Sequence, residues 1–67
     1  MPTGKVKWFS PSVGYGIIIP DGGGKEVFVH VSAVTKAGLS SLTEGERLNY
    51  DLIKRLGKEA AQNLRVA

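Results

Sequence analysis

The aromatic and basic side chains near the N-terminus are the residues of this sequence best suited to bind a charged polymer. Lys5, Lys7, Trp8 and Phe9 place two ammonium groups and two rings within five residues. Lysine neutralises phosphate groups, and stacking of an unpaired base on an aromatic ring contributes about 1 to 3 kcal/mol. This segment could therefore hold both the backbone and the bases of a nucleic acid.

Lys7 and Trp8 are adjacent in the chain, so a regular strand would send their side chains to opposite faces. Placing both in one site requires a β-bulge, a strong bend or an edge position.

Two later segments carry further candidate binding residues with a period of two. If both segments are strands, Tyr15, Phe28 and His30 lie on the outer face, because alternate side chains share a face. The expected core positions on these strands are Ile18, Val27, Val29 and Val31. A contiguous group of exposed rings is uncommon on a small protein, and a base-stacking surface would account for it. Gly14 and Gly16, which flank Tyr15, could admit a nucleotide backbone or allow the strand to curve.

Composition argues against catalysis, metal binding and membrane insertion. The 67 residues include no cysteine and one histidine, and they show no nucleophile elbow, phosphate loop or paired metal ligands. No apolar run approaches the roughly 20 residues of a membrane helix, and the first residues lack a secretory signal. We therefore expect a cytoplasmic, non-enzymatic protein without a cofactor or metal. The formal net charge of +3 favours a polyanionic partner.

The elements that position these residues read as a small all-β domain, which occupies residues 1–67 and is expected to be a monomer. Short apolar runs interrupted by Gly and Pro predict five strands, at residues 5–10, 15–20, 26–31, 47–54 and 60–66. The turn formers at 21–24 predict a hairpin. Residues 32–44 read as a longer connection anchored by Leu39 and Leu42, in which Ser32 caps a single helical turn.

The C-terminal segment has a second interpretation. Residues 52–64 are rich in helix formers, and although Gly57 argues against one continuous helix, residues 58–65 could form a helical turn or two. The barrel would then need another closing strand.

Three segments together resemble the bacterial cold-shock protein family in order and spacing. They are GKVKWF at 4–9, GYGII at 14–18 and VFVHVSA at 27–33, followed by the weaker matches LTEGER at 42–47 and AAQNL at 60–64. The resemblance covers nearly the whole chain. It implies a five-stranded antiparallel Greek-key barrel, an OB-fold, whose outer face binds single-stranded RNA and DNA, often as an RNA chaperone.

The sequence departs from that family at four positions. Ile17 and Val31 stand where Phe is usual, Val13 where a basic residue is usual, and Leu39 near a common aromatic position. We keep Ile17 and Val31 among the expected binding residues, as apolar contacts for bases. If each missing ring costs about 1 kcal/mol, affinity falls ten- to a hundredfold or more below that of a relative with all the rings.

The sequence thus predicts a sequence-tolerant, pyrimidine-leaning protein that binds single-stranded RNA or DNA. The predicted binding residues are Lys5, Lys7, Trp8, Phe9, Tyr15, Ile17, Phe28, His30 and Val31. The basic residues Lys54, Arg55, Lys58 and Arg65 read as plain surface, with phosphate contacts as the alternative. The rival function is a protein-interaction barrel that uses the same apolar face.

Overall fold

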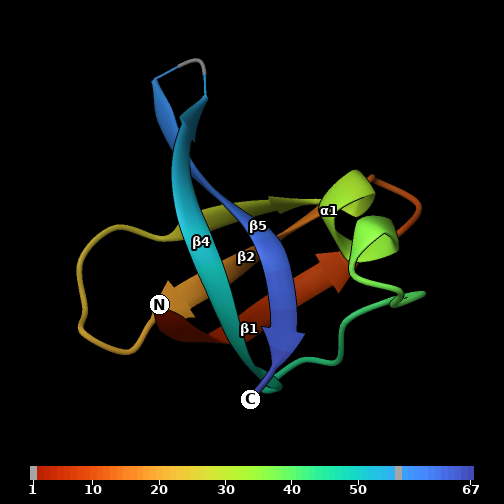
Figure 1. Ribbon diagram of the computed structural model, residues 1–67, viewed down its shortest axis with the longest axis horizontal. Helices are drawn as coiled ribbons and strands as arrows, with labels where there is room; N and C mark the ends of the chain where they lie inside the picture. The colour runs from red at the N-terminus through yellow and green to blue at the C-terminus, as the bar shows by residue number, and fades with distance from the viewer. Residues whose placement is uncertain (1, 56) are drawn as a thin grey trace.

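The computed structural model describes residues 2–55 and 57–67, apart from the side chain of Arg55. Five strands and one short helix follow one another along the chain (Figure 1). They are β1 (Thr3–Ser10), β2 (Tyr15–Pro20), β3 (Val27–His30), α1 (Val31–Lys36), β4 (Arg47–Arg55) and β5 (Lys58–Val66).

The strands close into a barrel in the order β1-β2-β3-β5-β4, which confirms the predicted five-stranded barrel. Four of the neighbouring pairs are antiparallel, but β3 and β5 run parallel, with Phe28 opposite Ala60 and Val29 opposite Ala61. The predicted antiparallel arrangement therefore holds for four of the five neighbouring pairs. A closed ring with an odd number of strands cannot alternate direction at every step, so one parallel pair is unavoidable.

The core is built from the inward side chains of all five strands, joined by two residues of α1 and one from the connection that follows it. Its members are Val6, Ile18, Val27, Val29, Ala33, Val34, Leu42, Leu48, Tyr50, Ala61 and Leu64. Ile18, Val27 and Val29 are buried as their alternation predicted. Leu39 packs partly against this core and Leu42 is buried, so both anchor the long connection as expected.

A β-bulge in β1 allows the adjacent residues Lys7 and Trp8 to lie on the same face of the sheet. Val6 lies opposite Ile18 and Trp8 lies opposite Ile17, which leaves Lys7 as the extra residue. Both Lys7 and Trp8 can then face away from the core, while Val6 remains buried.

Gly16 lets β1 approach β2 at this bulge. A Cβ at Gly16 would lie 2.5 Å from the carbonyl oxygen of Trp8 and 2.7 Å from Cδ1 of Phe9. This close approach of the two strands is a further role for Gly16, beside the nucleotide contact and the strand curvature considered from sequence. Gly14 has a positive φ of 97° and ends the turn between β1 and β2.

The chain leaves the sheet one residue earlier than predicted. β3 ends at His30, and Val31 is the first residue of α1, half-buried rather than in the core. His30 has extended backbone angles and its side chain accepts a hydrogen bond from the backbone N–H of Ser32. His30 is therefore the N-cap, and the assignment of that role to Ser32 is wrong. Alternation along a strand does not reveal where the backbone turns, which is why Val31 was misplaced.

The C-terminal segment is a strand, so the helical interpretation of residues 58–65 is wrong. β5 pairs with β4 along its length, and the hairpin they form projects beyond the rest of the barrel (Figure 1). A register shift between Asn49 and Asp51 coincides with Asn63, whose φ is 53°. Asn tolerates this left-handed conformation, and its Nδ2 donates a hydrogen bond of 2.8 Å to Asp51.

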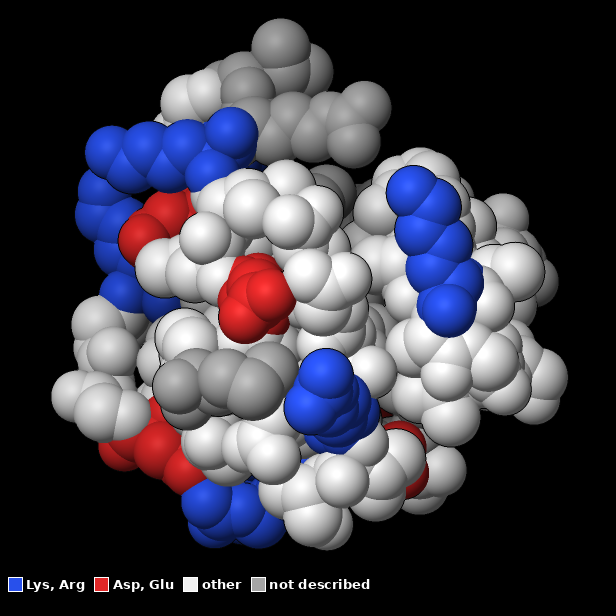
Figure 2. Space-filling model, in the orientation of Figure 1, with Lys and Arg blue, Asp and Glu red and all other residues white. Residues whose placement is uncertain are grey.

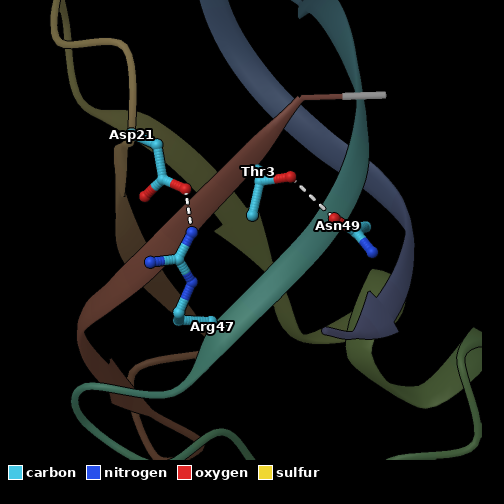
Figure 3. Close-up of polar contacts among 4 residues, drawn as sticks. All are labelled: Thr3, Asp21, Arg47 and Asn49. Atoms are coloured by element: carbon cyan, nitrogen blue, oxygen red, sulfur yellow. Dashed lines mark hydrogen bonds and ion pairs between the residues drawn. The ribbon is translucent and has the colours of Figure 1, made fainter.

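Polar contacts fasten the start of the barrel where β1 meets β4 (Figure 3). Arg47 forms an ion pair with Asp21, which follows β2, and Thr3 Oγ1 donates a hydrogen bond of 2.7 Å to Asn49 Oδ1. None of the predicted binding residues takes part in these contacts.

Candidate functional site

The register of the first three strands brings the predicted outer-face residues into rows. Trp8 lies opposite Ile17, and Ile17 lies opposite Phe28. In the neighbouring row Tyr15 lies opposite His30. The first strand contributes through its bulge and the other two through simple alternation, so side chains from three segments meet on one surface.

Three rings on this surface touch in sequence. The centroids of Trp8 and Tyr15 are 5.4 Å apart with the planes inclined by 60°, and those of Tyr15 and Phe28 are 4.6 Å apart at 21°. All three side chains are half-buried, so their rings are packed yet accessible. We call Trp8, Tyr15, Ile17 and Phe28 the aromatic strip, in which Ile17 is the aliphatic member.

Lys58 reaches this strip from β5, the strand that pairs with β3. The sequence did not predict this contact. Its Nζ lies 5.5 Å from the centroid of the Phe28 ring, within cation–π range. Tyr15 approaches Phe28 from β2 and Lys58 approaches it from β5, so the ring has a neighbour on either side. The interpretation of Lys58 as plain surface is therefore incomplete. Because Lys58 and Phe28 are 30 residues apart, only the β3–β5 pairing could reveal their contact.

The two predicted lysines differ in their surroundings. Lys5 is exposed, and its strand position lies opposite Ile19, which is also exposed. Lys7 forms an ion pair of 2.7 Å with Glu26, and both side chains are about half exposed. Such a surface pair contributes at most about 1 kcal/mol, so a phosphate group can compete for Lys7. Ile19 continues the outward period of Tyr15 and Ile17, and that period could have identified it from sequence.

Phe9 and Val31 lie outside the strip. Phe9 is half-buried and packs against the core, opposite Gly16. Val31 is half-buried at the start of α1. The structure therefore places Trp8, Tyr15, Ile17, Phe28 and His30 in paired positions on the outer face, with Lys7 exposed at the bulge. Phe9 instead packs against the core, and Val31 begins α1.

His30 is exposed, and its ring orientation is set by α1. Its Nδ1 lies 3.1 Å from the backbone N of Ser32 and 2.9 Å from Ser32 Oγ. Because Nδ1 accepts the backbone hydrogen bond, the neutral ring carries its proton on Nε2. The Nε2–H group is then a donor available to an acceptor such as a pyrimidine carbonyl or a phosphate oxygen.

Within residues 2–55 and 57–67 there is no group of three or more His, Cys, Asp or Glu side chains placed to hold a metal ion. Across the same residues, no helix is long and apolar enough to span a bilayer.

Comparison with known proteins agrees with the family resemblance seen in the sequence. The sequence profile of the "Cold-shock" DNA-binding domain matches residues 2–67. The chain is 49% identical to the cold shock protein CspA of Rhizobium meliloti over the full length of both chains. It is 52% identical to a cold shock-like protein CspA of Rickettsia bellii, covering 96% of this chain and 91% of the relative. Identity to the cold shock-like protein CspE of Escherichia coli K12 is 41%, covering 91% and 88%.

Proposed function

The chain belongs to the cold-shock domain family of nucleic-acid-binding proteins, and we propose that it binds single-stranded RNA and DNA by stacking bases on the aromatic strip. The observation that carries this proposal is the run of contacts from Trp8 through Tyr15 to Phe28 on one face. Bases in a duplex are already stacked on their neighbours, whereas unpaired bases expose their faces. A stacking surface therefore favours single strands.

Binding by stacking tolerates many sequences, because every base has a π-face. Modest preferences arise from stacking strength and backbone flexibility, and we expect them to favour pyrimidines. The Nε2–H group of His30 adds a donor for a base carbonyl beside the strip. Lys5 and Lys7 add sequence-independent attraction for phosphates.

As part of the same proposal, the protein acts as an RNA chaperone in the cytoplasm, as a monomer and without enzymatic activity. A protein that binds only the open form of an RNA hairpin shifts the equilibrium toward that form, in proportion to its free concentration and its differential affinity. No energy source is needed. A hairpin carrying a fluorophore and a quencher at its ends would report this opening directly.

The rival function is a docking surface for another protein, and the exposed apolar members of the face give it some support. Ile19 is 44% exposed beside Ile17, so the aliphatic surface extends past the rings. Salt distinguishes the two functions. Displacement of counterions makes nucleic-acid affinity fall steeply with salt concentration, whereas apolar docking between proteins does not follow that law.

The test is the affinity for a labelled single strand and its duplex, measured by anisotropy at low and moderate salt. We expect binding of the single strand alone, weakened by salt and by Phe28→Ala. Val66→Ala is the matched control, because Val66 is 55% exposed on β5, six residues beyond the position that pairs with Phe28. Equal loss in both variants, or equal affinity for the duplex, would count against the aromatic strip.

A further inference from the structure

A groove beside the aromatic strip lies between α1 and β5, and Figure 2 shows the hollow between these two elements. Its floor is apolar, with Phe28, Ile53 and Ala60, and its rim carries Lys36, Lys58 and Gln62. The cavity measures about 510 Å³, within the range of small-molecule sites. Because Phe28 and His30 line it as well, the groove is continuous with the strip.

The charged side chains that line the groove are all positive. Two lysines and one histidine line it, together with no aspartate or glutamate. Among the described residues, the ion pairs are Lys7 with Glu26 and Arg47 with Asp21, so neither Lys36 nor Lys58 is neutralised by such a pair. Figure 2 shows a basic side chain to the right of the hollow, with uncharged surface immediately around it. The ligand that fits this groove is an anion with an apolar portion.

The aromatic strip alone is too short for the strand it would bind. The row from Trp8 to Phe28 spans two interstrand spacings, about 10 Å. With one base stacked on each ring, its three rings accommodate about three bases. OB-folds contact about 4 to 16 nucleotides, so a bound strand must continue beyond the strip.

We propose that the groove between α1 and β5 is a second subsite for the same single strand, which leaves the strip at Phe28 and enters the groove. This inference rests on the proposed function. One phosphate binds between Lys36 and Lys58, and its base lies against Phe28 and Ile53, with the Gln62 amide near the base edge. A base arriving on this side of Phe28 takes the place of the Lys58 ammonium, which turns from the ring to the phosphate.

Lys36→Gln is the decisive variant, because Lys36 is the last residue of α1 and belongs to no aromatic contact. Arg65→Gln is the matched control for the change in charge, since Arg65 is exposed at the far end of β5 and does not line the groove. Lys36→Arg should restore the phosphate contact. The probes are a trithymidine and a labelled oligothymidine of about nine nucleotides, followed both by anisotropy and by quenching of Trp8.

We expect Lys36→Gln to weaken binding of the longer strand severalfold and to reduce its salt slope by about 0.7, the value for one phosphate contact on a single strand. Binding of the trinucleotide should be unchanged, Lys36→Arg should behave like the unmodified protein, and Arg65→Gln should have little effect. Backbone amide signals of Ala33 and Gln62 should shift with the longer strand only.

The outcomes separate the groove from the strip. If Lys36→Gln and Arg65→Gln have the same small effect while Trp8 is still quenched, the groove is not a subsite and the strip stands. If anisotropy reports binding that depends on Lys36 while Trp8 is not quenched, the strip fails and the groove holds. If neither probe binds, both proposals are wrong.

Discussion

The ring of Tyr15 stacks on the ring of Phe28, with centroids 4.6 Å apart and planes inclined by 21°. Tyr15 comes from β2 and Phe28 from β3, in diagonal positions, because Phe28 lies directly opposite Ile17. The stack fixes both rings before any ligand arrives, so less side-chain freedom is lost on binding. It leaves Ile17 as the one aliphatic position between Trp8 and Phe28.

Replacing Ile17 by phenylalanine should therefore strengthen binding. A ring at this position completes the row, and one additional stacked base contributes about 1 to 3 kcal/mol, which corresponds to about fivefold to more than a hundredfold in affinity. The measurement is a titration of Ile17→Phe with oligothymidine. Val66→Phe adds a ring to an exposed strand position away from the strip and is the control. Equal gains in both variants would indicate general stickiness rather than a completed row.

Neutralising Glu26 should also raise affinity, because it releases Lys7. The ion pair between these residues holds the Lys7 ammonium at 2.7 Å from a carboxylate. Loss of this competitor should increase affinity severalfold, about 0.5 to 1 kcal/mol, and steepen the salt dependence. Glu44→Gln carries the same change of charge in the connection before β4 and should have less effect. An unchanged affinity and salt slope in Glu26→Gln would show that Glu26 does not compete with phosphate for Lys7.

Gly16→Ala should destabilise the barrel. Its Cβ would lie 2.5 Å from a backbone oxygen of β1, so the two strands must separate at the bulge. Overpacking of this kind costs about 1 to 3 kcal/mol, and more where backbone must move. Urea unfolding would measure the loss. Gly22→Ala is the control, since nothing lies within 4 Å of a Cβ at Gly22. If both variants are equally stable, the close approach at Gly16 is not a constraint.

Tyr50 should make the barrel sensitive to alkaline pH. Burial raises the pKa of its hydroxyl above the ordinary value, and the carboxylates of Asp21 and Glu59 raise this pKa further. The folded state therefore holds the proton more tightly than the unfolded state. The free energy of unfolding is unaffected below about pH 10 and falls above it, because the unfolded chain then binds fewer protons.

Urea midpoints between neutral pH and about pH 11 would show this fall. Tyr50→Phe should lose less stability over the interval than the unmodified protein. The two proteins differ in no other side chain, so the difference between them isolates Tyr50. Identical pH dependence of the two proteins would contradict this role.

Local pattern was sufficient to predict the strands and much of the core. β2 was predicted with the bounds that the structure shows, because Gly14 and the turn after Pro20 limit a run of alternating residues. The sequence limited Lys7 and Trp8 to a bulge, a strong bend or an edge position, since adjacent residues cannot share a face on a regular strand. Only the structure selects the bulge.

What local pattern could not supply is where the chain bends and which distant segments meet. Val31 continues the valine alternation of β3, but a hydrogen bond from the Ser32 N–H to His30 starts the helix there. The parallel pairing of β3 with β5 brings Lys58 beside Phe28, and no local signal reports it. Phe9 is an aromatic residue beside Lys7 and Trp8 and was therefore predicted to bind bases. The bulge, however, turns its side chain against the core.

The most direct test of the aromatic strip is the fluorescence of Trp8, the only tryptophan, during titration with oligothymidine and with the corresponding duplex. We predict quenching by the single strand alone, weakened by added salt and by Phe28→Ala, and unaffected by Val66→Ala. A folded protein whose Trp8 does not respond to the single strand, or responds equally to the duplex, would contradict the central claim.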